Sequence, residues 1–275
     1  NQTYQNLELI ILDDCSNDNS CDIINEYRNH PKISHIELNK KNTASPFLQW
    51  QKGIHLAKGK WIWLAESDDS ADINFLEKVI KENKNNEEVS LFFCKSSVID
   101  ATGEQSSLYG FSFFPNVTDE IKIKEANGEG KKLAITCFIN NNLFVNASAL
   151  VFKKDLFDKV EKFWNSSSFR LHGDYALWIE MLKICNFMYI PFVGNKYRCH
   201  ENTVRRTYSN CYLRETFVNL KRFIQLYPEI ENETIDNYIY KLKKEMFINW
   251  ENRITLVWFL LKKFKLRYIR TVIFN

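Results

Sequence analysis

The chain has 275 residues, of which 45% are hydrophobic and 26% charged, the composition of an ordinary globular protein. Its net charge of +3 does not indicate nucleic acid as a partner. Seven scattered cysteines, none of them in a Cys-x-x-Cys pair, exclude a disulfide framework and a zinc site, and they favour a reducing cytoplasm.

Strands and helices are predicted to alternate through the first hundred residues. Apolar runs predict strands at residues 7–12, 32–38, 60–66 and 89–100, and helical periodicity predicts helices at about 21–30, 45–59 and 70–84. This alternation indicates an α/β fold with a mostly parallel, Rossmann-like sheet flanked by helices.

The second half of the chain is expected to be less regular. Residues 101–133 are polar and contain glycine, which is typical of long loops. A strand at 147–152, a helix at 173–185 and a strand at 187–200 follow. Three helical segments at about 212–226, 232–250 and 254–270 then predict a helical C-terminal extension over residues 206–275.

Acidic residues gather where two of the predicted strands end. Asp13 and Asp14 close the first strand, and Glu66, Asp68 and Asp69 follow the third. Ligands of open α/β sheets bind at the carboxyl ends of strands, and clustered carboxylates need a positive charge to neutralise them. Mg²⁺ or Mn²⁺ together with a nucleoside diphosphate would supply that charge.

Two alternatives account for acids at these positions. Aspartate and serine at strand-to-helix turns often cap helices and bind nothing else. A phosphorylated receiver-type domain also has an acidic edge on an α/β sheet. It would need an acid at the end of its third strand and a lysine after its fifth, and we cannot place either one in this sequence.

Four segments together resemble the family 2 glycosyltransferases, which have the GT-A fold. "NQTYQNLELIILDDCSNDNS" is similar to the opening of that family, where a strand ends in an Asp-Asp-x-Ser turn. "GIHLAKGKWIWLAESDD" resembles its DxD-like motif, "LHGDYALWIEML" its acceptor-side acidic motif, and "YRCHENTVRRTYS" its Arg-x-His loop. The order of the four motifs implies a GT-A domain over residues 1–205, with a nucleotide-binding part at about 1–100 and an acceptor part at about 101–205.

The resemblance implies a role for each matching acid. Asp13 and Asp14 would hold the nucleoside, and Asp68 would face the ribose or the diphosphate. Asp69 would be the metal ligand, with Mn²⁺ or Mg²⁺ as the cofactor. Asp174 would be the catalytic base of an inverting transfer, although it could also cap the helix that follows Gly173.

Basic residues would complete the implied site. His200 matches a histidine that approaches the metal or the diphosphate, and Arg198 could contact phosphate, although both could instead belong to a solvated surface loop. Trp50 stands where many members carry a phosphate-binding arginine. Lys52 or Lys58 is therefore expected to supply that charge.

The sequence departs from the family pattern in two further places. The usual first strand is not seen, so we expect a central strand of the fold to be missing from these residues. The acceptor motif reads Gly-Asp at Gly173 and Asp174 where Glu-Asp is commoner.

Residues 253–274 contain six basic residues and no acid, next to dense apolar residues. Such a segment can lie on an anionic membrane surface, which predicts peripheral contact at the cytoplasmic face. The alternative is a terminal helix that packs on the domain.

The resemblance as a whole implies a metal-dependent, inverting enzyme. It would move a sugar from a nucleotide-diphosphate donor, a UDP-sugar, to a hydroxyl of a glycan or of a lipid-linked saccharide. One rival interpretation is a non-catalytic module that binds sugar nucleotides or carbohydrate within a larger glycan-assembly protein. A nucleotidyltransferase is disfavoured. Such an enzyme usually has a glycine-rich phosphate loop near its start, and no such loop is visible in this sequence.

Overall fold

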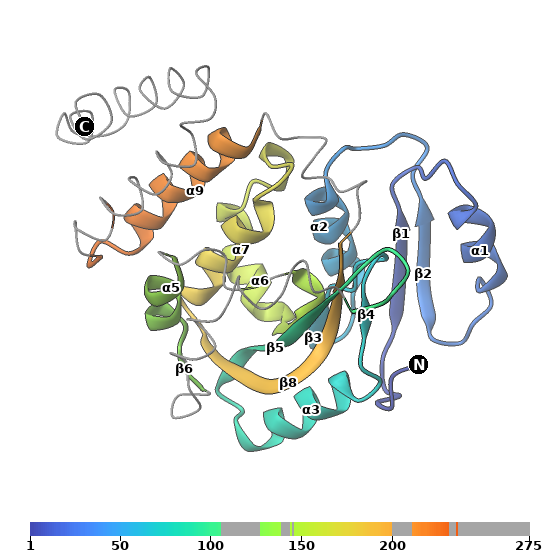
Figure 1. Cartoon of the computed structure of the whole chain (residues 1–275), viewed down its shortest axis with the longest axis horizontal. Helices are drawn as coiled ribbons and strands as arrows, with labels where there is room; N and C mark the ends of the chain where they lie inside the picture. The colour runs from blue at the N-terminus through green and yellow to red at the C-terminus, as the bar shows by residue number, and fades with distance from the viewer. Residues whose placement is uncertain (106–126, 139–143, 145, 200–210, 231–234, 236–275) are drawn as a thin grey trace.

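The computed structural model describes residues 1–105, 127–138, 144, 146–199, 211–230 and 235. It has an α/β fold in which helices surround a central sheet, with a smaller two-stranded sheet beside it (Figure 1). The boundary predicted at residue 205, the helices predicted at 232–250 and 254–270, and the basic segment 253–274 all lie outside the described residues, so these stay predictions.

The smaller sheet is formed by the first two predicted strands. β1 (Leu9–Asp13) and β2 (Ile33–Leu38) run parallel, and helix α1 (Ser20–Glu26) connects them. Asp13 pairs with Leu38 at the carboxyl end of both strands. No described strand joins β1 to the central sheet. The expectation of a further strand stays a prediction.

The central sheet contains six of the described strands. Along its main path the order is β3 (Trp61–Trp63), β7 (Leu150–Lys153), β5 (Val89–Ile99), β8 (Asn186–Arg198) and β4 (Ser70–Ala71). A short strand, β6 (Asn127–Glu129), pairs with the start of β8, and β4 pairs with its end.

The α/β class is confirmed, but the sheet is mixed, whereas the alternation of strands and helices predicted a mostly parallel one. β1–β2 and β5–β8 are parallel, and the other pairs of described strands are antiparallel. The reason is the position of β7, which follows β5 in the chain after a long excursion and inserts between β3 and β5 in the opposite direction. Segment order alone cannot reveal that insertion.

Strand β8 bends sharply along its length, as Figure 1 shows. Its pairing with β5 shifts where Cys94 faces Ile190 but Lys95 faces Val193, and again before Asn195. A side chain at Gly194 would lie 2.7 Å from the Cys94 sulfur, so only glycine fits there. The bulges turn the end of β8 towards β4 and the residues just before it.

Most helices fall where periodicity predicts them, with different ends. They are α2 (Pro46–Leu56), α3 (Phe75–Asn85), α7 (Gly173–Leu182) and α9 (Tyr212–Leu226), and a further helix, α6 (Lys154–Val160), follows β7. The helix predicted from residue 70 begins at Phe75, because Ser70 and Ala71 pair with β8 as β4. The loop predicted through residue 133 is wrong from residue 127 onward, where β6 leads into α5 (Gly130–Phe138).

Helix α7 forms the centre of the hydrophobic core. Its residues from Ala176 to Leu182 are all buried, which is the pattern of a helix surrounded by other elements. Trp178 lies against Trp50 of α2, with ring centroids 6.2 Å apart, and Phe47 packs edge-on to Trp50 at 5.2 Å. Trp50 therefore joins α2 to the core.

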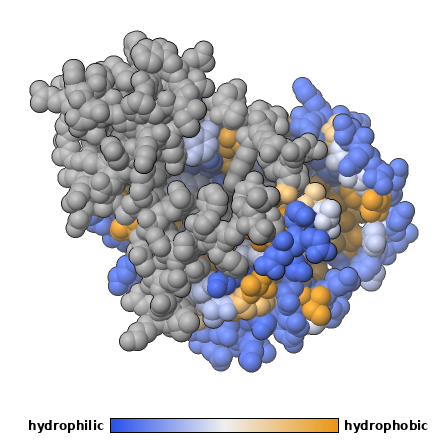
Figure 2. Space-filling view, viewed as in Figure 1, coloured by the Kyte–Doolittle hydropathy of each residue, from blue (hydrophilic) through white to orange (hydrophobic). Residues whose placement is uncertain are grey.

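Hydrophilic residues cover much of the described surface in Figure 2, with apolar residues in scattered patches. The large apolar side chains that stay exposed come from several elements, among them Leu9 in β1, Phe163 after α6 and Val218 in α9. Among the described residues, no helix is both long enough and apolar enough to cross a membrane.

Candidate active site

Asp13 ends β1 and is a buried residue, 6% exposed. It accepts hydrogen bonds from the Ser16 amide at 2.9 Å and from the Ser16 hydroxyl. Between them, Cys15 has a φ of 66°, in the left-handed region, and this turns the chain back toward the carboxylate. Burial raises the pKa of Asp13, but the hydrogen bonds from Ser16 and Cys21 outweigh it and bring the pKa below its usual value.

Asp14 organises the loop that follows β2. Its carboxylate accepts hydrogen bonds from the Asn39 side chain at 2.8 Å, from the amide and hydroxyl of Thr43, and from Gln49 of α2 at 2.9 Å. The two acids thus fix the turn after β1 and the loop after β2. Direct contact of either acid with a nucleoside stays a prediction.

Lys52 lies on α2 and faces this same network. Its ammonium group pairs with Glu37 of β2 and donates to the Asn39 side chain at 3.2 Å. Lys52 and Asp14 are therefore linked indirectly, because both form hydrogen bonds with the Asn39 side chain. Its predicted contact with phosphate would require it to leave or share the Glu37 carboxylate.

A second group of acids follows β3. Glu66, Asp68 and Asp69 each offer a carboxylate oxygen, and these atoms all lie within 4.8 Å of one another. The Asp69 amide donates to the Glu66 carbonyl at 3.2 Å, which closes a tight turn and brings the side chains together. We call Glu66, Asp68 and Asp69 the acid cluster.

Asp69 is held from behind by polar residues of the core. Its carboxylate accepts hydrogen bonds from the Ser148 hydroxyl at 2.7 Å, from the Asn146 side chain, and from the Arg198 amide at 3.0 Å. Asn146 and Ser148 are 5% and 2% exposed, so this support is rigid. Both precede β7, far from Asp69 in sequence, and nothing in the "NAS" stretch marks them as partners of the acid.

The environment of Asp69 disfavours its charged form. Burial raises its pKa above the ordinary value, as does the neighbouring charge of Asp68, against the hydrogen bonds from Ser148, Arg198 and Asn146. A carboxylate offers about four acceptor positions, and three are filled here. The acid cluster thus fits a hard divalent cation, which binds oxygen ligands and would offset the repulsion.

Arg198 closes the other side of the acid cluster. Its guanidinium donates to the carbonyls of Asp68 at 2.8 Å and Asp100 at 2.9 Å, and so ties the acid cluster to the loop after β5. The structure thus brings Arg198, Asp68 and Asp69 together. Contact between Arg198 and phosphate stays a prediction, and His200 lies outside the described residues.

Asp174 lies in the first turn of α7 and is partly buried. The N-cap of this helix is His172, so Asp174 does not have the capping position that the alternative interpretation gave it. A side chain at residue 173 would come within 2.5 Å of the Phe47 ring, which explains why glycine replaces the commoner glutamate. A carboxylate in a first turn is favoured by the helix dipole.

Comparison with known proteins identifies the class that this fold and site define. The profile of the family described as "Glycosyl transferase family 2" matches residues 1–157, more than half of the chain. The chain belongs to this family, and the resemblance drawn from its four motifs is confirmed.

Two named relatives match over a larger share of this chain than the family profile does. Glycosyltransferase GlyG of Streptococcus pneumoniae is 27% identical over 217 residues, covering 75% of this chain and 65% of GlyG. Poly(ribitol-phosphate) beta-N-acetylglucosaminyltransferase TarP of Staphylococcus aureus is 24% identical over 250 residues, covering 82% of this chain and 69% of TarP. The chain spans 56–65% of the length of four curated relatives that it matches.

Solved structures confirm the fold. The structure of S. aureus TarS 1-349 in complex with UDP-GlcNAc superposes with a TM-score of 0.68 at 12% identity, covering 98% of this chain and 74% of the TarS chain. The complex of the same protein with UDP gives a TM-score of 0.63 at 13% identity, covering 94% of this chain and 72% of TarS. The GT-A fold predicted from the sequence motifs is thereby confirmed.

Proposed function

We propose that this glycosyltransferase moves a sugar from a UDP-sugar to a hydroxyl of a glycan or of a lipid-linked saccharide, with inversion and with the help of a divalent cation. The observation that carries the proposal is the acid cluster, in which the partly buried Asp69 lies beside Asp68 and has a raised pKa. Family membership and the likeness to a protein solved with UDP-GlcNAc support the donor class.

Asp69 and Asp68 would hold Mn²⁺ or Mg²⁺, with Glu66 beside them. The cation would stabilise the negative charge that develops on the departing diphosphate. Asn146 and Ser148 keep the Asp69 carboxylate in one orientation, so the protein does not have to order this ligand when the cation binds. His200 is proposed as a further ligand.

Asp174 would act as the general base. In this role it takes the proton of the acceptor hydroxyl while the acceptor oxygen forms its bond to the anomeric carbon. The bond from that carbon to the diphosphate oxygen breaks in the same step, and the electron pair leaves with UDP. Attack opposite the leaving group inverts the anomeric configuration.

Asp13 and Asp14 would shape the nucleoside side of the site. Asp14 fixes the loop through Asn39 and Thr43, and Asp13 fixes the turn through Ser16. Lys52 and Arg198 would add positive charge on the nucleotide side. The acceptor and the peripheral membrane contact through residues 253–274, at the cytoplasmic face, belong to the proposal alone.

The test is a panel of nucleotide sugars offered to the protein with Mn²⁺ and with EDTA. We expect UDP release from one or more UDP-sugars with Mn²⁺, and its loss with EDTA. Binding of UDP-sugars without any turnover, across acceptors that include glycans and lipid-linked saccharides, would favour the non-catalytic module. Equal turnover with EDTA would reject the role of the cation.

Membrane contact is tested separately with vesicles. If residues 253–274 lie on an anionic surface, each basic residue contributes about 1 kcal/mol, and salt screens it. The protein should then sediment with anionic vesicles at low salt and be released in part at high salt. Equal, negligible sedimentation with anionic and neutral vesicles would reject the contact.

A further inference from the structure

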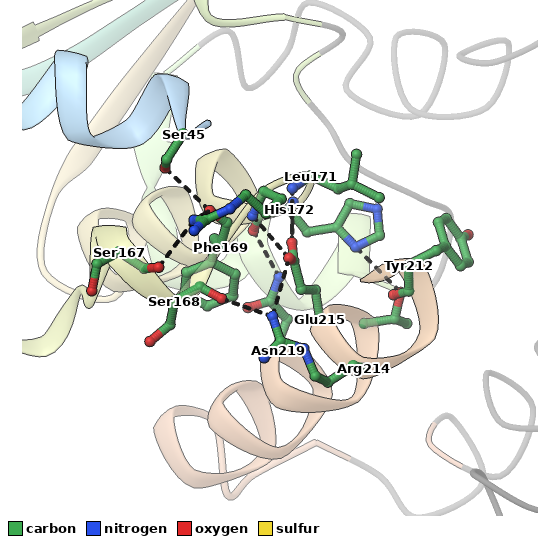
Figure 3. Close-up of polar contacts among 12 residues, drawn as sticks. Ser45, Ser167, Ser168, Phe169, Leu171, His172, Tyr212, Arg214, Glu215 and Asn219 are labelled. Atoms are coloured by element: carbon green, nitrogen blue, oxygen red, sulfur yellow. Dashed lines mark hydrogen bonds and ion pairs between the residues drawn. The ribbon is translucent and has the colours of Figure 1, made fainter. Parts of the chain in front are cut away.

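Helix α9 carries a buried carboxylate that faces the loop just before Asp174. Glu215 is 1% exposed and accepts hydrogen bonds from three successive backbone amides, those of Arg170 at 2.8 Å, Leu171 at 2.9 Å and His172 at 2.9 Å (Figure 3). Neither the motif pattern nor the family resemblance singles out this glutamate.

Burying the Glu215 carboxylate costs free energy, and its hydrogen bonds to the loop amides offset that cost. A buried carboxylate needs donors, and successive amides can converge on one acceptor only when the chain bends around it. Hydrogen bonds to a charged acceptor are stronger than those between neutral groups. Glu215 therefore selects one conformation of residues 170–172, which lead directly into α7.

Two further side chains of the same helix hold His172, the N-cap of α7. Asn219 donates to the His172 carbonyl at 2.9 Å, and the Thr216 hydroxyl lies 3.3 Å from its Nδ1 atom. Residues 215, 216 and 219 lie within about one turn, so a single face of α9 makes these contacts. His172 precedes Asp174 by two residues, so the direction of the first turn of α7 follows from these bonds.

The loop is also held from the opposite side. Ser45, the N-cap residue of α2, donates from its hydroxyl to the Phe169 carbonyl at 3.1 Å, and its own carbonyl accepts from the Thr43 hydroxyl. The Thr43 amide in turn donates to the Asp14 carboxylate. The loop before Asp174 therefore connects α9 to the side of the site that would bind the nucleoside, and Figure 3 shows Ser45 and Glu215 on either side of it.

We infer that Glu215 is a positioning residue that sets the place of Asp174 relative to the donor, with Asn219 as its partner. The inference rests on the proposed role of Asp174 as the base. General-base catalysis depends on distance, and a displacement of about 1 Å can lower a rate about a hundredfold. A helix outside the four motifs would thus control the chemical step.

The test compares Glu215→Gln with Glu180→Gln, a matched control. Glu180 is 4% exposed, lies on α7, and pairs with Arg222 of α9, so it also joins these two helices but away from the loop. Glu215→Gln keeps the shape of the side chain and turns an NH₂ group toward the loop amides. Three quantities are measured in the full chain: kcat for UDP release from the UDP-sugar selected by the panel, UDP affinity with Mn²⁺, and hydrogen exchange of residues 166–175.

We expect Glu215→Gln to lower kcat about tenfold to a hundredfold, to leave UDP affinity within twofold, and to speed exchange in residues 166–175. Glu180→Gln should change neither kcat nor that exchange. Asn219→Ala, a milder change, should move kcat and exchange in the same direction and keeps the inference testable if Glu215→Gln fails to fold.

Unchanged kcat in Glu215→Gln and Asn219→Ala, or an equal loss in Glu180→Gln, would overturn the inference. Asp174→Asn is run in parallel to separate the two claims. If that variant keeps wild-type kcat, the proposed base is wrong. If it loses kcat while the Glu215 and Asn219 variants keep theirs, only the positioning role fails.

Discussion

The two groups of acids at strand ends look alike in sequence but differ in how the protein surrounds them. Asp13 and Asp14 after β1 accept hydrogen bonds from the protein's own donors, and the pKa of Asp13 is lowered. Asp69 after β3 is also hydrogen-bonded and is partly buried, but burial and the neighbouring charge of Asp68 raise its pKa. A carboxylate whose hydrogen bonds lower its pKa supports the fold in its charged form, whereas we propose that Asp69, beside a like charge, binds a cation.

The largest expected effect comes from replacing Asp69, the acid that we propose as a cation ligand. Asp69→Ala should abolish sugar transfer and Mn²⁺-dependent UDP binding while the fold survives, because the variant loses both a ligand and an unfavourable charge. Calorimetry with UDP and Mn²⁺ measures the binding, and circular dichroism checks the fold. Asp158→Ala, which removes an exposed acid of α6, is the control. Unchanged Mn²⁺-dependent UDP affinity in Asp69→Ala would show that Asp69 does not bind the cation.

Asp174 belongs to neither group of acids, and replacing it should lower the rate of sugar transfer without weakening donor binding. Asp174→Asn is expected to lower kcat at least ~100-fold, the scale of a general base, and to leave donor binding nearly intact. Steady-state kinetics and UDP titration on the same preparation measure the two quantities. A kcat within a few-fold of wild type would leave Asp174 with only a structural role in the first turn of α7.

Replacing Asp14 should lower the stability of the folded protein. Asp14→Ala leaves donors of Asn39, Thr43 and Gln49 without their acceptor, and an unpaired donor costs about 1–3 kcal/mol. Water can replace part of this loss, because Asp14 is only partly buried, so we expect the free energy of unfolding to fall by about 2 kcal/mol. Urea titration measures it against Asp158→Ala. A stability equal to wild type would show that the hydrogen bonds of Asp14 do not support the fold.

The smallest effect is a difference in pH dependence. The pKa of Asp13 is lowered, so its stabilising contribution is complete above its ordinary value of 3.8 and is lost as pH falls through the folded pKa. The pKa of Asp69 is raised, so the folded state loses stability as pH rises from 3.8 through the folded pKa, and a bound cation should offset that loss.

The measurement is the shift in Tm on adding Mn²⁺ across a pH series. The shift should be full at neutral pH and should shrink as pH falls through the raised pKa of Asp69, because protons and the cation compete for the same oxygens. In Asp69→Ala the shift should be absent throughout. A shift independent of pH would place the cation on other groups.

The sequence alone determined the α/β class, the family and the acids at the strand ends. These follow from local patterns: apolar runs, helical periodicity, and motifs whose residues are close together in the chain. Even the departure at Gly173 was visible, although its cause, the Phe47 ring against it, was not.

Only the tertiary structure decided how each acid is surrounded. The donors that hold Asp69 come from Asn146, Ser148 and Arg198, and the carboxylate that orders the loop before Asp174 comes from α9. The insertion of β7 between β3 and β5, which made the sheet mixed, is likewise a pairing between distant segments. Contacts of this kind leave no periodic trace in a single sequence, because they depend on how far-separated segments meet in space.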